Sequence, residues 1–238
     1  MIGFDLMYLV FVGPFLLLSF WASYRVKSTF NKWRAYENSR RYTGAEVARA
    51  ILNASGCADV KVEHIAGSLS DHYDPTSRTL RLSDDTFAST SVAAAGVAAH
   101  EAGHAIQHKV SYPFLNFRSA IVPLASFGSR ISWTLIMIGF LLMFFVQSSL
   151  GYYAAWAGVL LFSTVVVFQL ITVPVEINAS TRAKQILKEM QFVGPRESEA
   201  VNQVLNAAAW TYVAAALTGV AQLLYFIFRL GGFGSSDD

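Results

Sequence analysis

The sequence predicts a mainly α-helical membrane protein with four transmembrane helices and a small α+β portion on the cytoplasmic side. Of its 238 residues, 54% are hydrophobic and only 14% are charged, whereas soluble domains carry about 25% charged residues. Four stretches are apolar over the roughly 20 residues that a helix needs to cross a bilayer. The longest segment between them contains helical and strand-like patterns, which predicts a folded extramembrane portion.

The four predicted spans are residues 6–24, 131–150, 152–173 and 207–228. Gly151 separates the second span from the third and predicts a tight hairpin there. Polar residues dilute the fourth span, but their side chains can form hydrogen bonds across a helix bundle. The stretch before the second span, Tyr112–Arg130, is apolar but broken by two prolines. It is predicted either to lie along the membrane interface or to extend the second span.

Lysine and arginine residues predict the orientation, because they are enriched in cytoplasmic loops. Most of the 18 lie between the first and second spans, and four more lie between the third and fourth. The hairpin tip has none, and the chain ends in two aspartates. We therefore expect a multi-pass protein of the cell (inner) membrane, with both termini outside, residues 25–130 in the cytoplasm and residues 174–206 as a cytoplasmic helix.

The cytoplasmic residues 25–130 predict two helices and a small hairpin. Thr43 and Glu46 form the T-x-x-E pattern of a capping box, which predicts a helix over residues 42–56. Residues 60–65 and 79–83 alternate between apolar and polar types and predict strands. Because two or three short strands are not stable as an independent sheet, they are expected to pack on helices. Residues 91–109, rich in alanine and glycine, predict the second helix.

That second helix carries the stretch "AAHEAGHAIQH". His100 and His104 are four residues apart and share a helix face, so both can reach one metal ion. Glu101 lies beside them and can act as a base on a metal-bound water. This H-E-x-x-H arrangement is that of zinc metalloproteases. Packing or surface histidines are the alternative, but unpaired burial of these groups on a nearly charge-free helix would be costly.

The third zinc ligand must come from elsewhere. His108 lies about 12 Å along the helix axis from His100, and zinc–nitrogen bonds are only about 2 Å long. His108 is therefore predicted to support the ligands, face the substrate or be exposed. Glu176, just beyond the third span, is the predicted ligand, because a carboxylate there is costly without a partner. A solvated glutamate, or a partner of Arg182, is the alternative.

The motifs "DHYDP…TLRLS", "AAHEAGHAIQH" and "PVEINASTRA" occur in this order between four such spans. Over nearly the whole chain, the sequence resembles the YugP-like membrane zinc metallopeptidases. The resemblance implies a gluzincin-type zinc-protease portion, with one Zn²⁺ per chain on His100, His104 and Glu176 and with Glu101 as the general base. It also implies an edge strand that pairs with extended substrate, formed by Thr79, Leu80, Arg81, Leu82 and Ser83.

Members of the wider clan often carry an aspartate four residues after the glutamate ligand, where it orients a ligand histidine. This chain has Ser180 there, and Asn178 or Asp71 is the alternative partner. A donor for the oxyanion of the transition state is also needed. The candidates for that role are Arg182, Tyr73 and Tyr212.

The stretch "SDHYDP", Ser70–Pro75, allows two interpretations. Asp71, His72 and Asp74 could hold a second metal ion, but an Asx-rich turn is favoured. The lone cysteine, Cys57, cannot form an internal disulfide and is expected to be a small buried hydrophobic residue.

These features predict a membrane-embedded zinc endopeptidase that hydrolyses protein or peptide substrates in or near the lipid bilayer, using a zinc-activated water and a glutamate base. The alternatives are a non-catalytic zinc-binding scaffold or adaptor and a site-2-type intramembrane protease. The motif helix is too polar for a clear span, which disfavours the latter. No Lys/Arg-rich block is present, so no nucleic-acid partner is expected. A membrane-protein partner or a homo-oligomer is left open.

Overall fold

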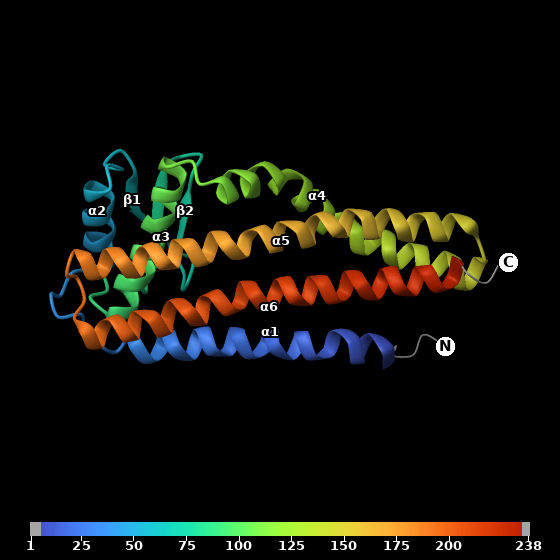
Figure 1. The fold of residues 1–238 in the computed structure, drawn as a ribbon, viewed down its shortest axis with the longest axis horizontal. Coiled ribbons are helices and arrows are strands. Elements are labelled where there is room, and N and C mark those ends of the chain that lie inside the picture. Colours follow the sequence, from blue (N-terminus) through green and yellow to red (C-terminus); the bar gives the residue numbers. More distant parts are fainter. Residues whose placement is uncertain (1–5, 235–238) are drawn as a thin grey trace. The chain divides into compact units, whose positions relative to one another are not determined.

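The computed structural model describes residues 6–234. Helices dominate, and three short strands form one sheet (Figure 1). The elements in chain order are α1 (Leu6–Trp33), α2 (Gly44–Ala54), β1 (Lys61–His64), β2 (His72–Asp74), β3 (Thr79–Leu82), α3 (Val92–Lys109), α4 (Pro113–Leu141), the π-helix η1 (Leu142–Val146), α5 (Ser149–Glu189) and α6 (Pro195–Gly234).

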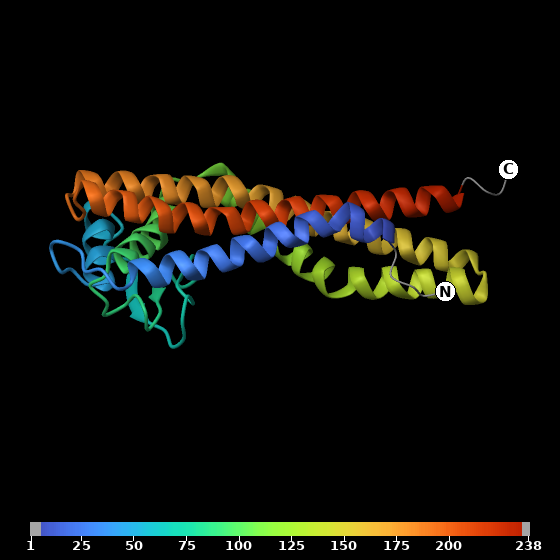
Figure 2. The same ribbon diagram turned by 90° about the horizontal axis from the view of Figure 1, so that it is seen from below.

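The chain forms two compact units. Unit 1 consists of residues 6–21, Phe117–Val173 and 212–234, and unit 2 consists of Ala22–Asn116 and Pro174–Thr211. The sheet and helices α2 and α3 therefore belong entirely to unit 2. Within unit 2, the end of α5 and the start of α6 lie side by side in both views of the ribbon (Figures 1 and 2).

Within residues 6–234, four helical segments are long and apolar enough to cross a membrane, which agrees with the predicted number of spans. Their boundaries differ from the prediction. α5 continues through Pro174 to Glu189 and α6 begins at Pro195, so residues 174–206 are not a separate helix. Residues 113–130 belong to α4, which places most of Tyr112–Arg130 in the same helix as the second span. An apolar stretch can end without ending its helix, because polar residues continue the same backbone hydrogen bonds.

In unit 1, glycine allows α4 and α5 to pack closely. A Cβ added to Gly139 would lie 2.5 Å from the backbone nitrogen of Ala155, so a larger residue does not fit. The chain turns at Gln147, whose φ of 50° is left-handed. The prediction that Gly151 forms the turn is therefore wrong. Gly151 lies in the first turn of α5, where an added Cβ would be 2.7 Å from the Gly139 carbonyl oxygen.

Polar side chains of the fourth span form hydrogen bonds to the first, as predicted. The Thr218 hydroxyl lies 3.0 Å from that of Ser19 and donates to the Phe15 carbonyl oxygen at 3.1 Å. The Gln222 amide donates to the Tyr8 hydroxyl at 3.0 Å. These contacts join α6 to α1 in a setting where unpaired polar groups are costly.

Unit 2 has its own hydrophobic core. The predicted capping box begins α2, with the Thr43 hydroxyl accepting from the Glu46 amide and the Glu46 carboxylate accepting from the Thr43 amide. Apolar residues of α2, β3, α3, α5 and α6 are buried together. Cys57 is 1% exposed and belongs to this core, as expected for a small hydrophobic residue.

The sheet has the order β1–β3–β2, with β1 parallel and β2 antiparallel to β3. The prediction that Thr79–Ser83 is an edge strand is therefore wrong, because β3 is paired on both sides. Leu80 and Leu82 are fully buried, but alternating burial occurs in edge and central strands alike. The sequence pattern could not distinguish the two positions, since the outer strand β2 is only three residues long.

Candidate metal centre

The helix that carries the H-E-x-x-H motif is bounded and positioned by small residues. Ser91 caps α3, and its hydroxyl accepts from the Ala94 amide at 3.1 Å. Gly103 faces α5, where an added Cβ would lie only 2.9 Å from the Ala179 carbonyl oxygen. Glycine therefore permits a backbone approach that other residues would resist. This close crossing of α3 and α5 brings Glu176 to the histidines.

His100, His104 and Glu176 converge at this crossing. The Glu176 Oε2 atom lies 3.1 Å from His100 Nε2 and 3.4 Å from His104 Nε2. The three side chains are only 12%, 11% and 3% exposed, in the same order. In a tetrahedral zinc site with bonds of about 2.1 Å, ligand atoms lie about 3.4 Å apart. The ligand atoms of the two imidazoles and the carboxylate all lie within 4.8 Å of one another, so a small inward shift suits zinc and leaves a fourth position for another ligand.

Glu101 is buried beside the two histidines, with 8% of its surface exposed. Burial raises the pKa of its carboxyl group above the ordinary value, while the neighbouring histidines oppose this effect. Burial also acts on His104 and lowers its pKa, but the hydrogen bond and charge of Glu176 outweigh it and the pKa is raised. A carboxyl group with a raised pKa holds a proton more readily, as is required of a group that accepts and returns one.

Each histidine has a partner on its outer nitrogen. Ser180 Oγ lies 3.1 Å from His100 Nδ1, at the position where the wider clan often carries an aspartate. Gln107 Oε1 lies 3.0 Å from His104 Nδ1. Gln107 is not among the residues predicted for the site, although the sequence carries a signal for it. His100, His104 and Gln107 follow the i, i+4, i+7 spacing of one helix face, and a buried amide on that face needs partners.

The remaining predicted residues do not contact the candidate metal ligands in the predicted way. Asn178 accepts hydrogen bonds from Gln107 and Arg182 instead of contacting a histidine. His108 does not join the ligands, and its Nδ1 atom lies 2.9 Å from the Tyr73 hydroxyl. Asp71 is not the partner of a histidine, since its carboxylate accepts from the backbone amide and hydroxyl of Ser83. Tyr212 belongs to unit 1.

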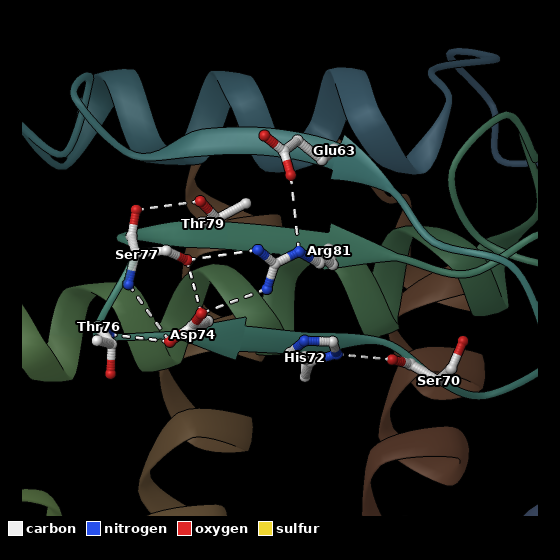
Figure 3. A network of polar contacts seen from close by, with 8 residues as sticks. All are labelled: Glu63, Ser70, His72, Asp74, Thr76, Ser77, Thr79 and Arg81. Carbon is white, nitrogen blue, oxygen red and sulfur yellow. Dashed lines mark hydrogen bonds and ion pairs between the residues drawn. The ribbon is translucent and has the colours of Figure 1, made fainter.

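The stretch Ser70–Pro75 contains strand β2, and the predicted Asx-rich turn lies just after it, at residues 75–78, where Asp74 accepts the hydrogen bonds. The Ser77 hydroxyl and the Thr76 amide donate to the Asp74 carboxylate, and these hydrogen bonds lower its pKa to about 2. Arg81 of the central strand also donates to Asp74, and the His72 ring contacts the Ser70 carbonyl oxygen (Figure 3). Within residues 6–234, these acidic groups and His72 do not form a cluster that could hold a metal ion.

The chain is similar to a family of zinc metallopeptidases and to a membrane protease. Residues 8–231 match the profile of a family described as "Putative neutral zinc metallopeptidase". The chain is 49% identical over 210 residues to "Putative membrane protease YugP" of Bacillus subtilis (strain 168), a match that covers 88% of this chain and 90% of that protein. No solved structure matches the chain.

Proposed function

Because the chain belongs to this family of neutral zinc metallopeptidases, we propose that it is a membrane-embedded, zinc-dependent endopeptidase. The observation that carries the proposal is the convergence of His100, His104 and Glu176 beside the buried Glu101. A scaffold that only stored a structural ion would gain nothing from a base at this position. The four apolar helices support an attachment to the membrane.

The residues divide the chemistry between them. A zinc ion held by His100, His104 and Glu176 would supply the Lewis acidity that polarises a peptide carbonyl and makes a water acidic near neutral pH. Glu101 takes the proton of the attacking water and delivers it to the leaving amine. No side chain forms a covalent bond to the substrate in this scheme.

Substrates are proposed to be membrane proteins, or peptides close to the bilayer, because the spans confine the site to the membrane. The excess of lysine and arginine in residues 25–130 supports a cytoplasmic site with both termini outside. Because β3 is paired on both sides, β2 is the better candidate for pairing with an extended substrate. Its second edge has no strand partner among residues 6–234.

The proposal is tested first by the metal content of detergent-purified protein, measured by mass spectrometry. We expect one zinc ion per chain in the wild type, its loss in Glu176→Ala, and its retention in His108→Ala. Glu189→Ala is the matched control, because Glu189 is an exposed carboxylate on the same helix. Loss of zinc in His108→Ala, with retention in Glu176→Ala, would overturn the ligand assignment.

Catalysis is tested by Glu101→Gln, which keeps the shape of the side chain but removes the base. We expect this variant to retain zinc and to lose cleavage of peptides reconstituted with the protein in liposomes. Wild type that binds zinc but cleaves no peptide would favour the scaffold, and wild type that binds no zinc, even after reconstitution, would count against the proposed function. Equal cleavage by wild type and variant would refute the role of Glu101.

A further inference from the structure

Gln107 is the most deeply buried polar group beside the metal centre, with none of its surface exposed. Its amide nitrogen donates to the Val175 carbonyl oxygen at 2.8 Å and to Asn178 Oδ1 at 3.0 Å. Its amide oxygen lies 3.0 Å from His104 Nδ1. One side chain of α3 therefore contacts a candidate ligand histidine and two groups of α5, the helix that carries Glu176.

The two groups on α5 determine which way this amide points. A backbone carbonyl such as that of Val175 can only accept a hydrogen bond. Arg182 can only donate, and its Nε atom donates to Asn178 Oδ1 at 2.8 Å, which turns the oxygen of Asn178 toward Gln107. Gln107 thus faces two acceptors and must present its NH₂ group to them. Its oxygen is left to face His104.

We propose that Arg182, Asn178 and Gln107 form a chain of hydrogen bonds that fixes the tautomer of His104. Because the Gln107 oxygen can only accept, the Nδ1 atom of His104 must carry the hydrogen. In the neutral ring that binds a metal ion, the lone pair of His104 is then on Nε2, the atom that faces Glu176. A neutral histidine binds a metal ion through its unprotonated nitrogen, so the chain preorganises His104 as a ligand. Gln107 is a positioning residue, and this inference rests on the proposed metal site.

His100 is held differently. Its partner Ser180 carries a hydroxyl, which can either donate or accept. Ser180 therefore orients the ring of His100 without dictating which nitrogen carries the hydrogen. The two histidines are expected to respond unequally when their partners are changed. Ser180→Ala should weaken zinc binding less than a change at Gln107.

The decisive variant is Gln107→Glu, which keeps the shape of the side chain and replaces the donor by a second acceptor. A carboxylate beside a ligand histidine ordinarily makes the histidine a stronger ligand. Here the carboxylate of Gln107→Glu would face the Val175 carbonyl oxygen and Asn178 Oδ1, which are acceptors that it cannot hydrogen-bond. We therefore expect the zinc affinity to fall by about 10- to 100-fold. Gln185→Glu makes the same chemical change at an exposed position of α5 and should leave the affinity unchanged.

Arg182→Met provides a test by rescue. Without the arginine, Asn178 can rotate its amide and donate to a carboxylate at position 107. We expect Arg182→Met alone to weaken zinc binding several-fold, yet to restore part of the affinity when combined with Gln107→Glu. A purely structural role of Gln107 predicts additive losses instead.

Affinity is measured on detergent-purified protein by competition for zinc with a chromophoric chelator. The visible spectrum of the cobalt(II)-loaded protein reports the coordination geometry. Tighter or unchanged zinc binding in Gln107→Glu would overturn the proposal, as would a double variant weaker than both single variants. If Gln107→Glu does not fold, Arg182→Met decides alone, and unchanged affinity there would overturn the proposal. Wild type that binds no zinc would instead count against the proposed function.

Discussion

Replacing Gly103 by alanine tests whether the crossing of α3 and α5 sets the metal geometry. The added Cβ would lie 2.9 Å from the Ala179 carbonyl oxygen, whereas ordinary contacts of this kind begin at 3.4 Å. The two helices must therefore separate locally by about 0.5 Å, which exceeds the tolerance of about 0.2 Å in metal–ligand distances. His104 is the next residue on α3, and Glu176 lies three residues before Ala179 on α5. We expect zinc affinity to fall by at least about 10-fold.

The same change should alter stability far less than metal binding. Overpacking a buried contact costs about 1–3 kcal/mol, and alanine in place of glycine inside a helix returns about 1 kcal/mol. The expected net loss is about 0–2 kcal/mol, so the protein should fold without zinc. This contrast separates a displaced metal site from a general loss of structure.

Gly96→Ala is the matched control on the same helix. An added Cβ at Gly96 would lie 3.5 Å from the nearest atom, a side-chain carbon of Val201, which is an ordinary contact. Zinc affinity should not change, and the free energy of unfolding should stay equal or rise by about 1 kcal/mol. Chelator competition and thermal unfolding, with and without zinc, measure both quantities. A Gly103→Ala protein that binds zinc as tightly as wild type would refute the reasoning.

Three further predictions concern the fold and the ion. In Gly158→Ala, the new Cβ would lie 2.8 Å from the Ser132 carbonyl oxygen, so the detergent-solubilised variant should unfold at a lower denaturant concentration than wild type. Gly231→Ala is the control, because its added Cβ would have no atom within 4 Å, and it should unfold like wild type. The lowered pKa of Asp74 stabilises the fold above pH 4, and this contribution is lost as the pH falls toward 2. The difference in unfolding temperature between wild type and Asp74→Asn should therefore shrink on acidification. A difference that stays constant with pH would refute this role of the Asp74 hydrogen bonds. Zinc at 100 times its dissociation constant should raise the free energy of unfolding by about 2.7 kcal/mol over chelated protein, as measured by denaturant titration.

Apolar length and local capping signals made the helices predictable from the sequence. Thr43 and Glu46 identify the start of α2, and His100 and His104 are placed together by helix periodicity alone. The end of α5 and the start of α6 could not be predicted in this way, because the polar segment after Val173 also forms a helix. Gly151 was misassigned for a related reason. Glycine suits both a turn and a close helix contact, and only the packing partner decides between them.

The order of the strands and the support of the metal ligands depend on contacts distant in sequence. Alternation placed Leu80 and Leu82 on a covered face but could not reveal how many neighbours β3 has. Glu176 was predicted from the cost of leaving a carboxylate unpaired at the end of a span. Gln107, three residues from His104 and seven from His100, shares their helix face, but its partners Val175 and Asn178 on the facing helix could not be read from the sequence.

The ligands and their supports come from only two helices. On α3 they follow the spacing of His100, Gly103, His104 and Gln107, and on α5 they lie within two turns around Glu176. The Gly103–Ala179 approach, the Ser180–His100 hydrogen bond and the Gln107–Val175 hydrogen bond all span the same crossing, and the His104–Gln107 hydrogen bond connects His104 to it. Metal binding and the closure of this crossing must then be thermodynamically linked, since closure raises the metal affinity by the same factor by which the bound metal favours closure. A displacement of α5 against α3 by a few tenths of an ångström would weaken all three ligands together, so loss of the ion should be cooperative and not stepwise.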